Sequence, residues 1–238
     1  TILLGPWPAI LVMTSVVSVQ ALIFQDGGLL ALGANILNMG IIGVAVSYAV
    51  FQFIQKIAGG KTWGIFGGGF LAAWFSIFIA SLAAAIQLAL SGTSPANIAI
   101  PAMASVHALI GVGEGLITAG ALTFIYASRR DLLKTNAPAS ASNKAILLGG
   151  LGIAALLAIL SPLASAHPDG LEWVAEQQGF LNSAQGSWFN IIPDYLIPGI
   201  SNEVVGTILA GIVGVAIVFL AVYFFAHSRR KTENKHNA

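Results

Sequence analysis

Two ionisable side chains interrupt a stretch of small and apolar residues, HALIGVGEGL at positions 107–116. His107 and Glu114 are seven positions apart, which on a helix is two turns, or roughly 10 Å, with both side chains near one face. A carboxylate inside a membrane usually faces a polar cavity or a partner, so both residues are candidates for lining a substrate pathway. The structural alternatives are a helix-packing hydrogen bond for Glu114 beside its neighbouring glycines and a satisfied interfacial position for His107.

A second polar group lies in QALIFQDGGLLALGANILNMG at positions 20–40. Its amides and its carboxylate belong to Gln20, Gln25, Asp26, Asn35 and Asn38. The glycines of the QDGG stretch permit a tight turn, and the two asparagines lie about one helical turn apart, where both could face one cavity. The alternative is hydrogen bonding between helices, which buried amides commonly provide in membranes.

Composition shows where these residues lie. Apolar residues make up 57% of the 238 positions and charged residues only 8%, whereas soluble domains carry about 25% charged residues. The chain is therefore an integral membrane protein. The net charge of +1 offers no basic surface for nucleic acid, so a nucleic-acid partner is excluded. The chain has no cysteine, which excludes disulfides and thiolate metal sites.

Six apolar runs are long enough to cross a bilayer, which takes about 20 residues. They are Ile2–Phe24, Leu29–Ile54, Trp63–Leu90, Ile98–Ala127, Ala145–Leu163 and Val204–Ala226. The runs are continuous and do not alternate, which indicates helices and not a barrel. The sequence predicts an all-α polytopic membrane protein with six transmembrane helices.

Basic residues predict the orientation, because they stay on the cytoplasmic side in short loops. If the first span runs outward, all ten basic residues fall on one side: Lys56, Lys61, Arg129, Arg130, Lys134, Lys144, Arg229, Arg230, Lys231 and Lys235. We expect a multi-pass protein of the cell (inner) membrane with both ends of this chain cytoplasmic and the 164–202 loop outside.

The organisation is a four-helix block over 1–127, a polar cytoplasmic linker over 128–144, and a two-helix hairpin over 145–238. No catalytic arrangement such as Ser-His-Asp or H-E-x-x-H is present, so the chain is predicted not to be an enzyme. GGKT at 59–62 lacks the first glycine of a phosphate-binding loop and joins two membrane helices. Any use of ATP must therefore belong to another subunit.

Three motifs resemble a known family. ILLGPWPAILVM at 2–13, the 20–40 stretch and HALIGVGEGLITA at 107–119 are similar to the CbiM/NikM family, the substrate-capture membrane subunits of energy-coupling-factor cobalt and nickel transporters, which serve cobalamin biosynthesis and nickel uptake. HPDGLEWVAE at 167–176 resembles the companion subunit, CbiN/NikN, so the chain resembles a fusion of the two. The resemblance implies cobalt(II) or nickel(II) as the transported ion, no covalently bound cofactor, and two kinds of partner: a transmembrane coupling subunit and cytoplasmic ATP-binding subunits.

The chain departs from the family at its start. In the family the metal is bound by an N-terminal Met-His-Ile-Pro-Asp-Gly segment and a second upstream histidine, and this sequence begins at Thr1 without them. We expect upstream helices and the primary metal site to precede Thr1. Six residues then remain candidates for lining the capture cavity or orienting the metal ligands: His107, Glu114, Asn35, Asn38, Gln20 and Asp26.

Two expectations follow. Glu114 should face the interior of the helix bundle on the side of His107, because a carboxylate facing hydrocarbon would lose its hydration, and the Asn35–Asn38 face is its first expected partner. The function class is uptake of cobalt or nickel ions, and the alternative class is a non-transport membrane scaffold or assembly subunit whose polar groups only hold helices together.

Overall fold

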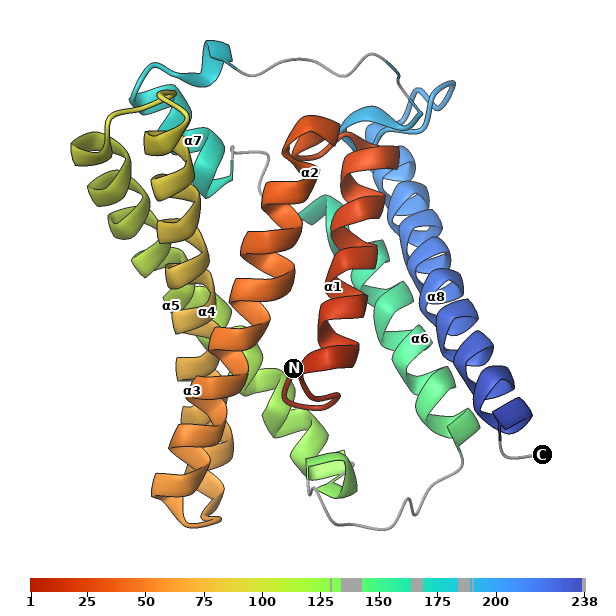
Figure 1. Ribbon diagram of the computed structural model, residues 1–238. Coiled ribbons are helices and arrows are strands. Elements are labelled where there is room, and N and C mark those ends of the chain that lie inside the picture. The colour runs from red at the N-terminus through yellow and green to blue at the C-terminus, as the bar shows by residue number, and fades with distance from the viewer. Residues whose placement is uncertain (129, 134–142, 164–168, 184–188, 190, 237–238) are drawn as a thin grey trace. The chain divides into compact units, whose positions relative to one another are not determined.

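The computed structural model describes all residues except 129, 134–142, 164–168, 184–188, 190 and 237–238. Most of the expected 128–144 linker and the start of the 164–202 loop therefore lie outside the described residues. Every regular element within the described ranges is a helix (Figure 1). The predicted all-α class is confirmed.

Five helical stretches of the described residues are long and apolar enough to cross a membrane. They are Pro6–Phe24, Gly28–Ala58, Thr62–Leu90, Ala96–Ala127 and Glu203–Phe225. The sixth expected span, Ala145–Leu163, corresponds to α6 (Asn143–Leu160) and a 3-10 turn (Ser161–Leu163), and its apolar stretch Leu147–Leu163 is shorter than the other five.

The first two spans are not uniform α-helices. The first consists of α1 (Pro6–Val19) and a π-helical turn (Gln20–Phe24). The second begins with α2 (Gly28–Asn35), passes through a π-helical stretch (Ile36–Ile42), and ends with α3 (Gly43–Ala58). π-helical turns are rare and often occur at functional sites, and here they contain two of the candidate residues, Gln20 and Asn38.

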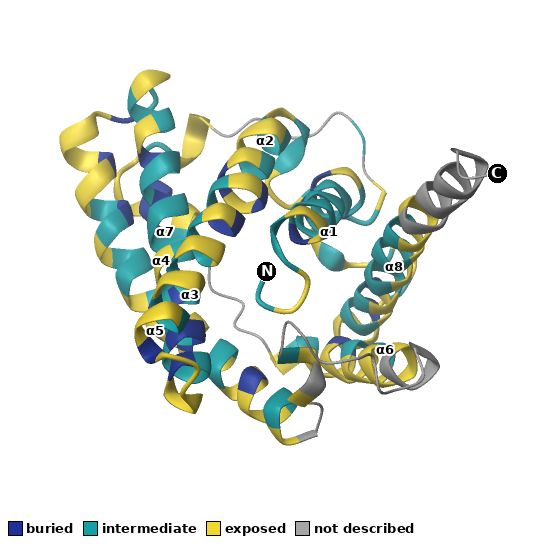
Figure 2. Ribbon diagram, turned by 60° about the horizontal axis from the view of Figure 1, so that its bottom comes forward, coloured by how far each residue is buried: buried dark blue, intermediate teal, exposed yellow. Residues whose placement is uncertain are grey.

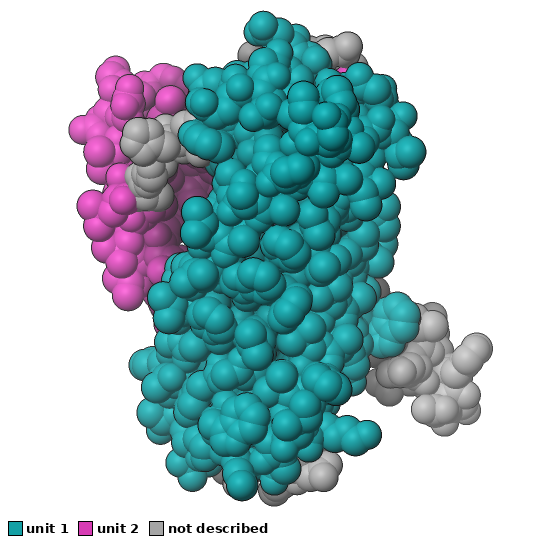
Figure 3. All heavy atoms as spheres, turned by 90° about the vertical axis from the view of Figure 1, so that its left-hand side faces the viewer, with its two compact units in different colours: residues 1–10, 34–140, 167–185 teal, residues 11–33, 141–166, 186–238 magenta. Residues whose placement is uncertain are grey.

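The chain forms two compact units (Figure 3). Unit 1 contains residues 1–10, 34–140 and 167–185, and unit 2 contains residues 11–33, 141–166 and 186–238. The helices of the first two spans each contribute to both units.

Unit 1 is built on α3, α4 (Thr62–Leu90) and α5 (Ala96–Ser128), which are joined by short turns and lie side by side (Figure 1). Glycines allow α4 and α5 to approach closely. A Cβ atom on Gly115 would lie 2.6 Å from the Phe70 ring, and one on Gly111 would lie 2.9 Å from Trp74. Small residues at a helix interface are typical of membrane proteins, where close backbone approach replaces the hydrophobic effect as the source of attraction.

A short helix, α7 (Gly170–Gln177), completes unit 1. The Asp169 side chain caps its N-terminus by accepting a hydrogen bond from the Glu172 N–H at 2.7 Å, as an N-cap aspartate does. Val174 is fully buried in an apolar cluster with Ala85, Ala99 and Met103 from the adjoining ends of α4 and α5. The α7 helix therefore lies at the end of the α4–α5 pair where the 91–95 turn joins them.

Unit 2 pairs α6 with α8 (Glu203–His236) through small residues. A Cβ atom on Gly211 of α8 would lie 3.2 Å from the Ala158 methyl group, and one on Gly214 would lie 3.1 Å from the Phe24 ring. Many large apolar side chains are exposed in both units. Figure 2 draws all exposed positions in yellow. Exposed hydrocarbon on a span-length helix is the surface expected to contact lipid.

Candidate functional site

Two of the predicted candidates, Gln20 and Asp26, lie together in unit 2 with Tyr195, which the sequence had not singled out. The Tyr195 hydroxyl donates a hydrogen bond to Asp26 Oδ2 at 2.5 Å. The Gln20 amide nitrogen lies 3.2 Å from the same carboxylate oxygen and 3.4 Å from the Tyr195 hydroxyl. We call Gln20, Asp26 and Tyr195 the Asp26 cluster.

The backbone around the Asp26 cluster is strained. Among the described residues, the only non-glycine residues with positive φ are Gln25 (62°), Asp194 (53°) and Tyr195 (59°). L-residues other than asparagine and aspartate rarely adopt this conformation, and it persists only where surrounding contacts enforce it. Such contacts are present: the Ile192 N–H donates to the Ile23 carbonyl at 3.0 Å, and the Gln25 amide donates to the Phe189 carbonyl.

Tyr195 is held on its ring face as well as at its hydroxyl. Its ring stacks on Phe24 with centroids 4.6 Å apart and an interplanar angle of 19°. Burial raises the pKa of the Tyr195 phenol well above its ordinary value, and the hydrogen bond to Asp26 raises it further. The phenol therefore stays a neutral donor to the Asp26 carboxylate at any physiological pH.

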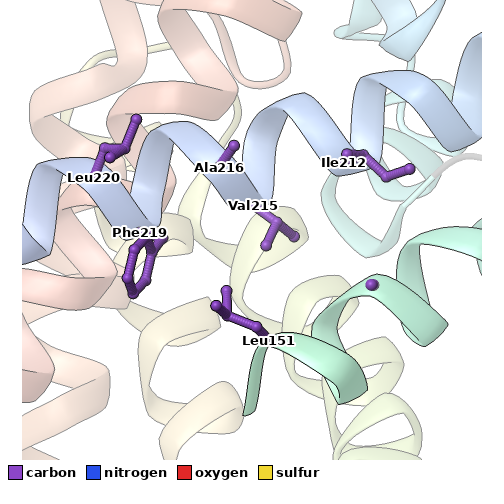
Figure 4. Close-up of a pocket in the computed structure, with 7 residues that line it drawn as sticks. Leu151, Ile212, Val215, Ala216, Phe219 and Leu220 are labelled. Carbon is purple, nitrogen blue, oxygen red and sulfur yellow. The ribbon is translucent and has the colours of Figure 1, made fainter. Parts of the chain in front are cut away.

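A cavity of about 650 Å³ lies in unit 2 beside this cluster. Two of its lining residues, Gln20 and Tyr195, have polar side chains, and the others are apolar residues and glycines of the first span, α6 and α8. A smaller pocket of about 390 Å³ adjoins it and is lined by apolar residues, including Leu151, Val215 and Phe219 (Figure 4). These walls suit hydrocarbon, since nickel and cobalt ions require nitrogen, oxygen or sulfur ligands.

His107 lies in unit 1, on the face of α5 that α7 covers. Its Nδ1 lies 2.9 Å from the Met103 carbonyl oxygen, so Nδ1 carries the proton and Nε2 is left as the acceptor. The imidazole is close to the first residue of α7, because a Cβ atom on Gly170 would lie 2.9 Å from both Cε1 and Nε2 of His107. His107 thus sits where α7 begins, next to its capping residue Asp169.

Asn38 is buried and pairs with Gln87 of α4, which the sequence analysis did not single out. The two amides exchange hydrogen bonds in both directions, each 2.8 Å long. This pairing uses the Asn38 amide, so the expected contact between Glu114 and Asn38 does not form within unit 1. Asn35 is half-buried at the start of the π-helical stretch.

Glu114 is exposed in this structure, and no side chain among the described residues hydrogen-bonds to it. Its neighbours Gly111 and Gly115 do admit α4, as the glycine pattern predicts, but α4 presents the rings of Trp74 and Phe70 there and no polar group. Gly113 meets nothing within 4 Å. The described residues of unit 1 therefore leave Glu114 uncovered.

The six candidates therefore do not form one site within either unit. Gln20 and Asp26 belong to the Asp26 cluster, while His107, Asn38, Asn35 and Glu114 occupy separate positions in unit 1. Within the described part of the chain, no three His, Cys, Asp or Glu side chains lie close enough together to hold a metal ion.

One of the two partners that the sequence did not indicate, Gln87, could have been predicted from it. Gln87 is the only amide side chain in the Trp63–Leu90 run, and a lone amide in a span needs a hydrogen-bonding partner from another span. The Tyr195 contact gave no such signal, because it joins residues that are 169 positions apart through a turn with unusual backbone angles.

Comparison with known families assigns the chain. Residues 1–132 match the family model CbiM, described as a cobalt uptake substrate-specific transmembrane region. The chain belongs to the CbiM family. Residues 144–231 match the PDGLE domain. Below, the CbiM region means residues 1–132 and the PDGLE domain means residues 144–231.

The relatives include proteins named as fused nickel transport proteins. The chain is 34% identical over 219 residues to a protein of Archaeoglobus fulgidus named as a fused nickel transport protein, NikMN, covering 91% of this chain and 71% of that one. It is 29% identical to the fused nickel transport protein NikMN of Rhodobacter capsulatus, covering 97% and 77%. The cobalt transport protein CbiM of Sorangium cellulosum is 36% identical over 138 residues, covering 56% of this chain and 60% of that one. No solved structure matches the chain.

Two contacts join the CbiM region to the PDGLE domain. Tyr195 belongs to the PDGLE domain, and its partners Asp26 and Gln20 belong to the CbiM region. Gly170 belongs to the PDGLE domain, and His107 belongs to the CbiM region. Each unit therefore contains a place where the PDGLE domain is docked on the CbiM region.

Proposed function

We propose that this chain is the substrate-capture membrane subunit of a transporter that takes up nickel or cobalt ions. The observation that carries the proposal is the presence of a CbiM region and a PDGLE domain in one chain, an arrangement shared with relatives named as fused nickel transport proteins. Because the relatives that match both parts are named for nickel, nickel is the first ion to test.

Energy for uptake comes, in this proposal, from a separate transmembrane coupling subunit and cytoplasmic ATP-binding subunits. The support is the absence of a phosphate-binding loop in the sequence: GGKT at 59–62 lies at the turn between α3 and α4 and at the first residue of α4, not after a strand as such a loop requires. Of the candidate residues, His107, Gln20 and Asp26 are proposed to act by positioning the PDGLE domain.

Uptake of radioactive nickel by cells without their own nickel importers tests the proposal. The full-length protein should support uptake only when it is produced together with coupling and ATP-binding subunits, and unlabelled cobalt in excess should show whether both ions share the path. The purified chain alone should have no ATPase activity. Absence of nickel and cobalt uptake in the complete system would favour the scaffold alternative, and uptake without the other subunits would contradict the energy source.

We also propose that both ends of the chain and the 128–144 linker are cytoplasmic and that the 164–202 loop is outside. Unit 1 supports this orientation: Lys56 and Lys61 flank the α3–α4 turn, while Asp169 and α7 lie at the opposite end of α4. The α4 helix has 29 residues, or about 43 Å of rise, which is enough to separate its ends by a bilayer.

Single cysteines test the orientation, because the chain has none of its own. Ser183→Cys should react with a membrane-impermeant thiol reagent in intact cells, and Ser142→Cys should react only after lysis. The reverse pattern would invert the topology.

A further inference from the structure

The cavity of about 650 Å³ in unit 2 is built by the CbiM region and the PDGLE domain together. Its lining combines Val16 of α1, Leu147 of α6 and Val215 of α8. Ligand pockets typically measure about 300–1,000 Å³ and are mostly apolar, with a few polar groups that orient the ligand. The smaller pocket shares Leu151, Val215 and Phe219 with it (Figure 4), so the apolar lining continues along α6 and α8.

The dimensions of this cavity fit a hydrocarbon chain and not a helix. Leu147 and Gly150 line it and are exposed, so it opens on the surface of unit 2. Along α8 its lining runs from Gly211 to Phe219, a rise of about 12 Å, which is close to the ~15 Å of hydrocarbon in one leaflet. A spanning helix that is about 10 Å across and about 30 Å long occupies roughly 2,400 Å³, several times the volume of the cavity.

Lipid chains are the molecules that surround this cavity. The stretches that line it on α1 and α8 belong to the spans Pro6–Phe24 and Glu203–Phe225. Water does not fill such an apolar cavity, since a buried water needs several polar partners. A narrow, flexible acyl chain can enter through the open side and bury its apolar surface against the three helices.

The polar part of the lining belongs to the Asp26 cluster. Gln20 and Tyr195 line the cavity and both donate hydrogen bonds to Asp26, which is exposed. Both donors are neutral, and in the sequence the unit 2 segments 11–33 and 186–226 contain no lysine or arginine. Asp194 adds a second carboxylate next to Tyr195 in the chain. A headgroup with an ammonium complements these charges, whereas a headgroup with net negative charge is repelled.

We propose that the unit 2 cavity binds a membrane lipid, with one acyl chain between the first span, α6 and α8 and with an ammonium headgroup at Asp26. Burial of the chain supplies the affinity, and the pair of ammonium and carboxylate supplies the selectivity among headgroups. The bound lipid fills the space between the CbiM region and the PDGLE domain and stabilises their contact in unit 2. This role of lipid is independent of which ion is transported.

Native mass spectrometry of the purified full-length protein measures the bound lipid. Loosely held lipid is first removed with detergent, and phosphatidylethanolamine and phosphatidylglycerol are then added in equal amounts. The first carries an ammonium group and the second has a net negative charge. The wild type should retain phosphatidylethanolamine in preference by about fivefold, which is the upper end for an exposed ion pair.

Gly150→Leu tests whether the lipid lies in the cavity. The leucine side chain would enter the cavity without a clash, since a Cβ atom on Gly150 meets nothing within 4 Å. This variant should lose most of the retained lipid. The matched control is Gly149→Leu, which is equally open at its Cβ position but does not line the cavity, and it should retain lipid as the wild type does. Both lipid-free variants should unfold at no lower temperature than the lipid-free wild type, because leucine is a better helix former than glycine.

Asp26→Asn tests the headgroup. Asparagine keeps the shape of the side chain and an oxygen that accepts the hydrogen bond from Tyr195, but it removes the negative charge. The variant should still retain lipid, and it should retain phosphatidylethanolamine and phosphatidylglycerol equally.

Three results would overturn the lipid site. If wild type and Gly150→Leu retain the same amount of lipid, the cavity of the full-length protein is empty or is filled by protein side chains. If Gly149→Leu loses as much lipid as Gly150→Leu, the lipid binds the outer surface of α6 and not the cavity. If wild type shows no preference between the two lipids, or if Asp26→Asn keeps the preference of the wild type, the headgroup does not pair with Asp26.

Discussion

The PDGLE domain meets the CbiM region in two chemically different ways. In unit 1, α7 packs through Val174 into an apolar cluster and places Gly170 directly against His107 and Ile110. In unit 2, Phe189, Ile192 and Tyr195 make hydrogen bonds to the Gln20–Asp26 stretch, with Tyr195 bonded to an exposed Asp26 and with Asp194 and Tyr195 both in the left-handed conformation.

The difference indicates which attachment is permanent and which can open. Close packing with a buried apolar residue is lost only at the cost of a cavity or newly exposed surface. Hydrogen bonds at an exposed carboxylate exchange with water at small net cost, and the strained backbone at Asp194 and Tyr195 would relax on release. We infer that α7 is the fixed anchor and that the Asp26 cluster is the releasable contact, beside the cavity of unit 2.

The anchor should be most sensitive to added volume at Gly170. A Cβ atom there would lie 2.7 Å from Ile110 Cδ1 and 2.9 Å from the His107 ring, so Gly170→Val should destabilise the docking of α7 by roughly 3 kcal/mol, at the top of the range for overpacked sites. Thermal unfolding in mild detergent and protease sensitivity around 170–183 measure the effect. The control is Gly152→Val in α6, where a Cβ atom meets nothing within 4 Å; equal effects at both sites would remove the steric argument.

A smaller effect is expected when the anchor loses volume. Val174 has no exposed surface, and Val174→Ala removes two methyl groups from its cluster, which corresponds to about 1–2 kcal/mol of lost burial. Trp173→Ala on the exposed side of the same helix is the control, since Trp173 is 43% exposed. If Trp173→Ala lowers the unfolding temperature more than Val174→Ala does, the apolar cluster is not what holds α7.

The anchor and the releasable contact also differ in how far the sequence could predict them. Continuous apolar runs identified the spans closely, as with Trp63–Leu90 against the observed Thr62–Leu90, because bilayer length is a strong constraint. The PDGLE motif is recognisable from its residues, but its contact with His107 depends on which helices become neighbours in the fold. That information is not contained in a single apolar run.

The polar residues show more clearly which contacts the sequence does not predict. The sequence predicted a group of amides and a carboxylate in the 20–40 stretch, and of that group Gln20 and Asp26 lie within hydrogen-bonding distance of each other. It gave the Asn35–Asn38 face as the first expected partner of Glu114, whereas Asn38 pairs with Gln87. The π-helical stretch Ile36–Ile42 changes which way Asn38 points, and a pattern that assumes a regular α-helix cannot anticipate that rotation.

Loss of the Tyr195 hydroxyl should affect stability less than either anchor variant. Tyr195→Phe removes the hydrogen bond to Asp26 but keeps the stack on Phe24, and because Asp26 is exposed, water can replace the lost donor. We expect a loss of about 0.5–1 kcal/mol, measured by thermal unfolding. The control is Tyr48→Phe in α3, whose hydroxyl makes no hydrogen bond among the described residues. If Tyr195→Phe lowers the free energy of unfolding by more than Val174→Ala does, the Asp26 cluster is the stronger attachment and α7 is not the fixed anchor.

The smallest effect concerns ionisation of Tyr195. Burial and the hydrogen bond to Asp26 raise the pKa of its phenol, so the contact is fully present below the ordinary tyrosine pKa of about 10 and is lost only as pH rises through the higher folded value. The tyrosinate absorbance of wild type minus that of Tyr195→Phe should therefore stay near zero through the ordinary range and appear only at higher pH. Asp26→Leu removes the interaction with the carboxylate and leaves the burial of the ring. The difference signal should therefore appear at a lower pH than in the wild type, but still above the ordinary tyrosine pKa. A difference signal that appears at the ordinary tyrosine pKa in the wild type would show that the phenol is already released from Asp26 in solution, and the releasable contact would then be open in the resting protein.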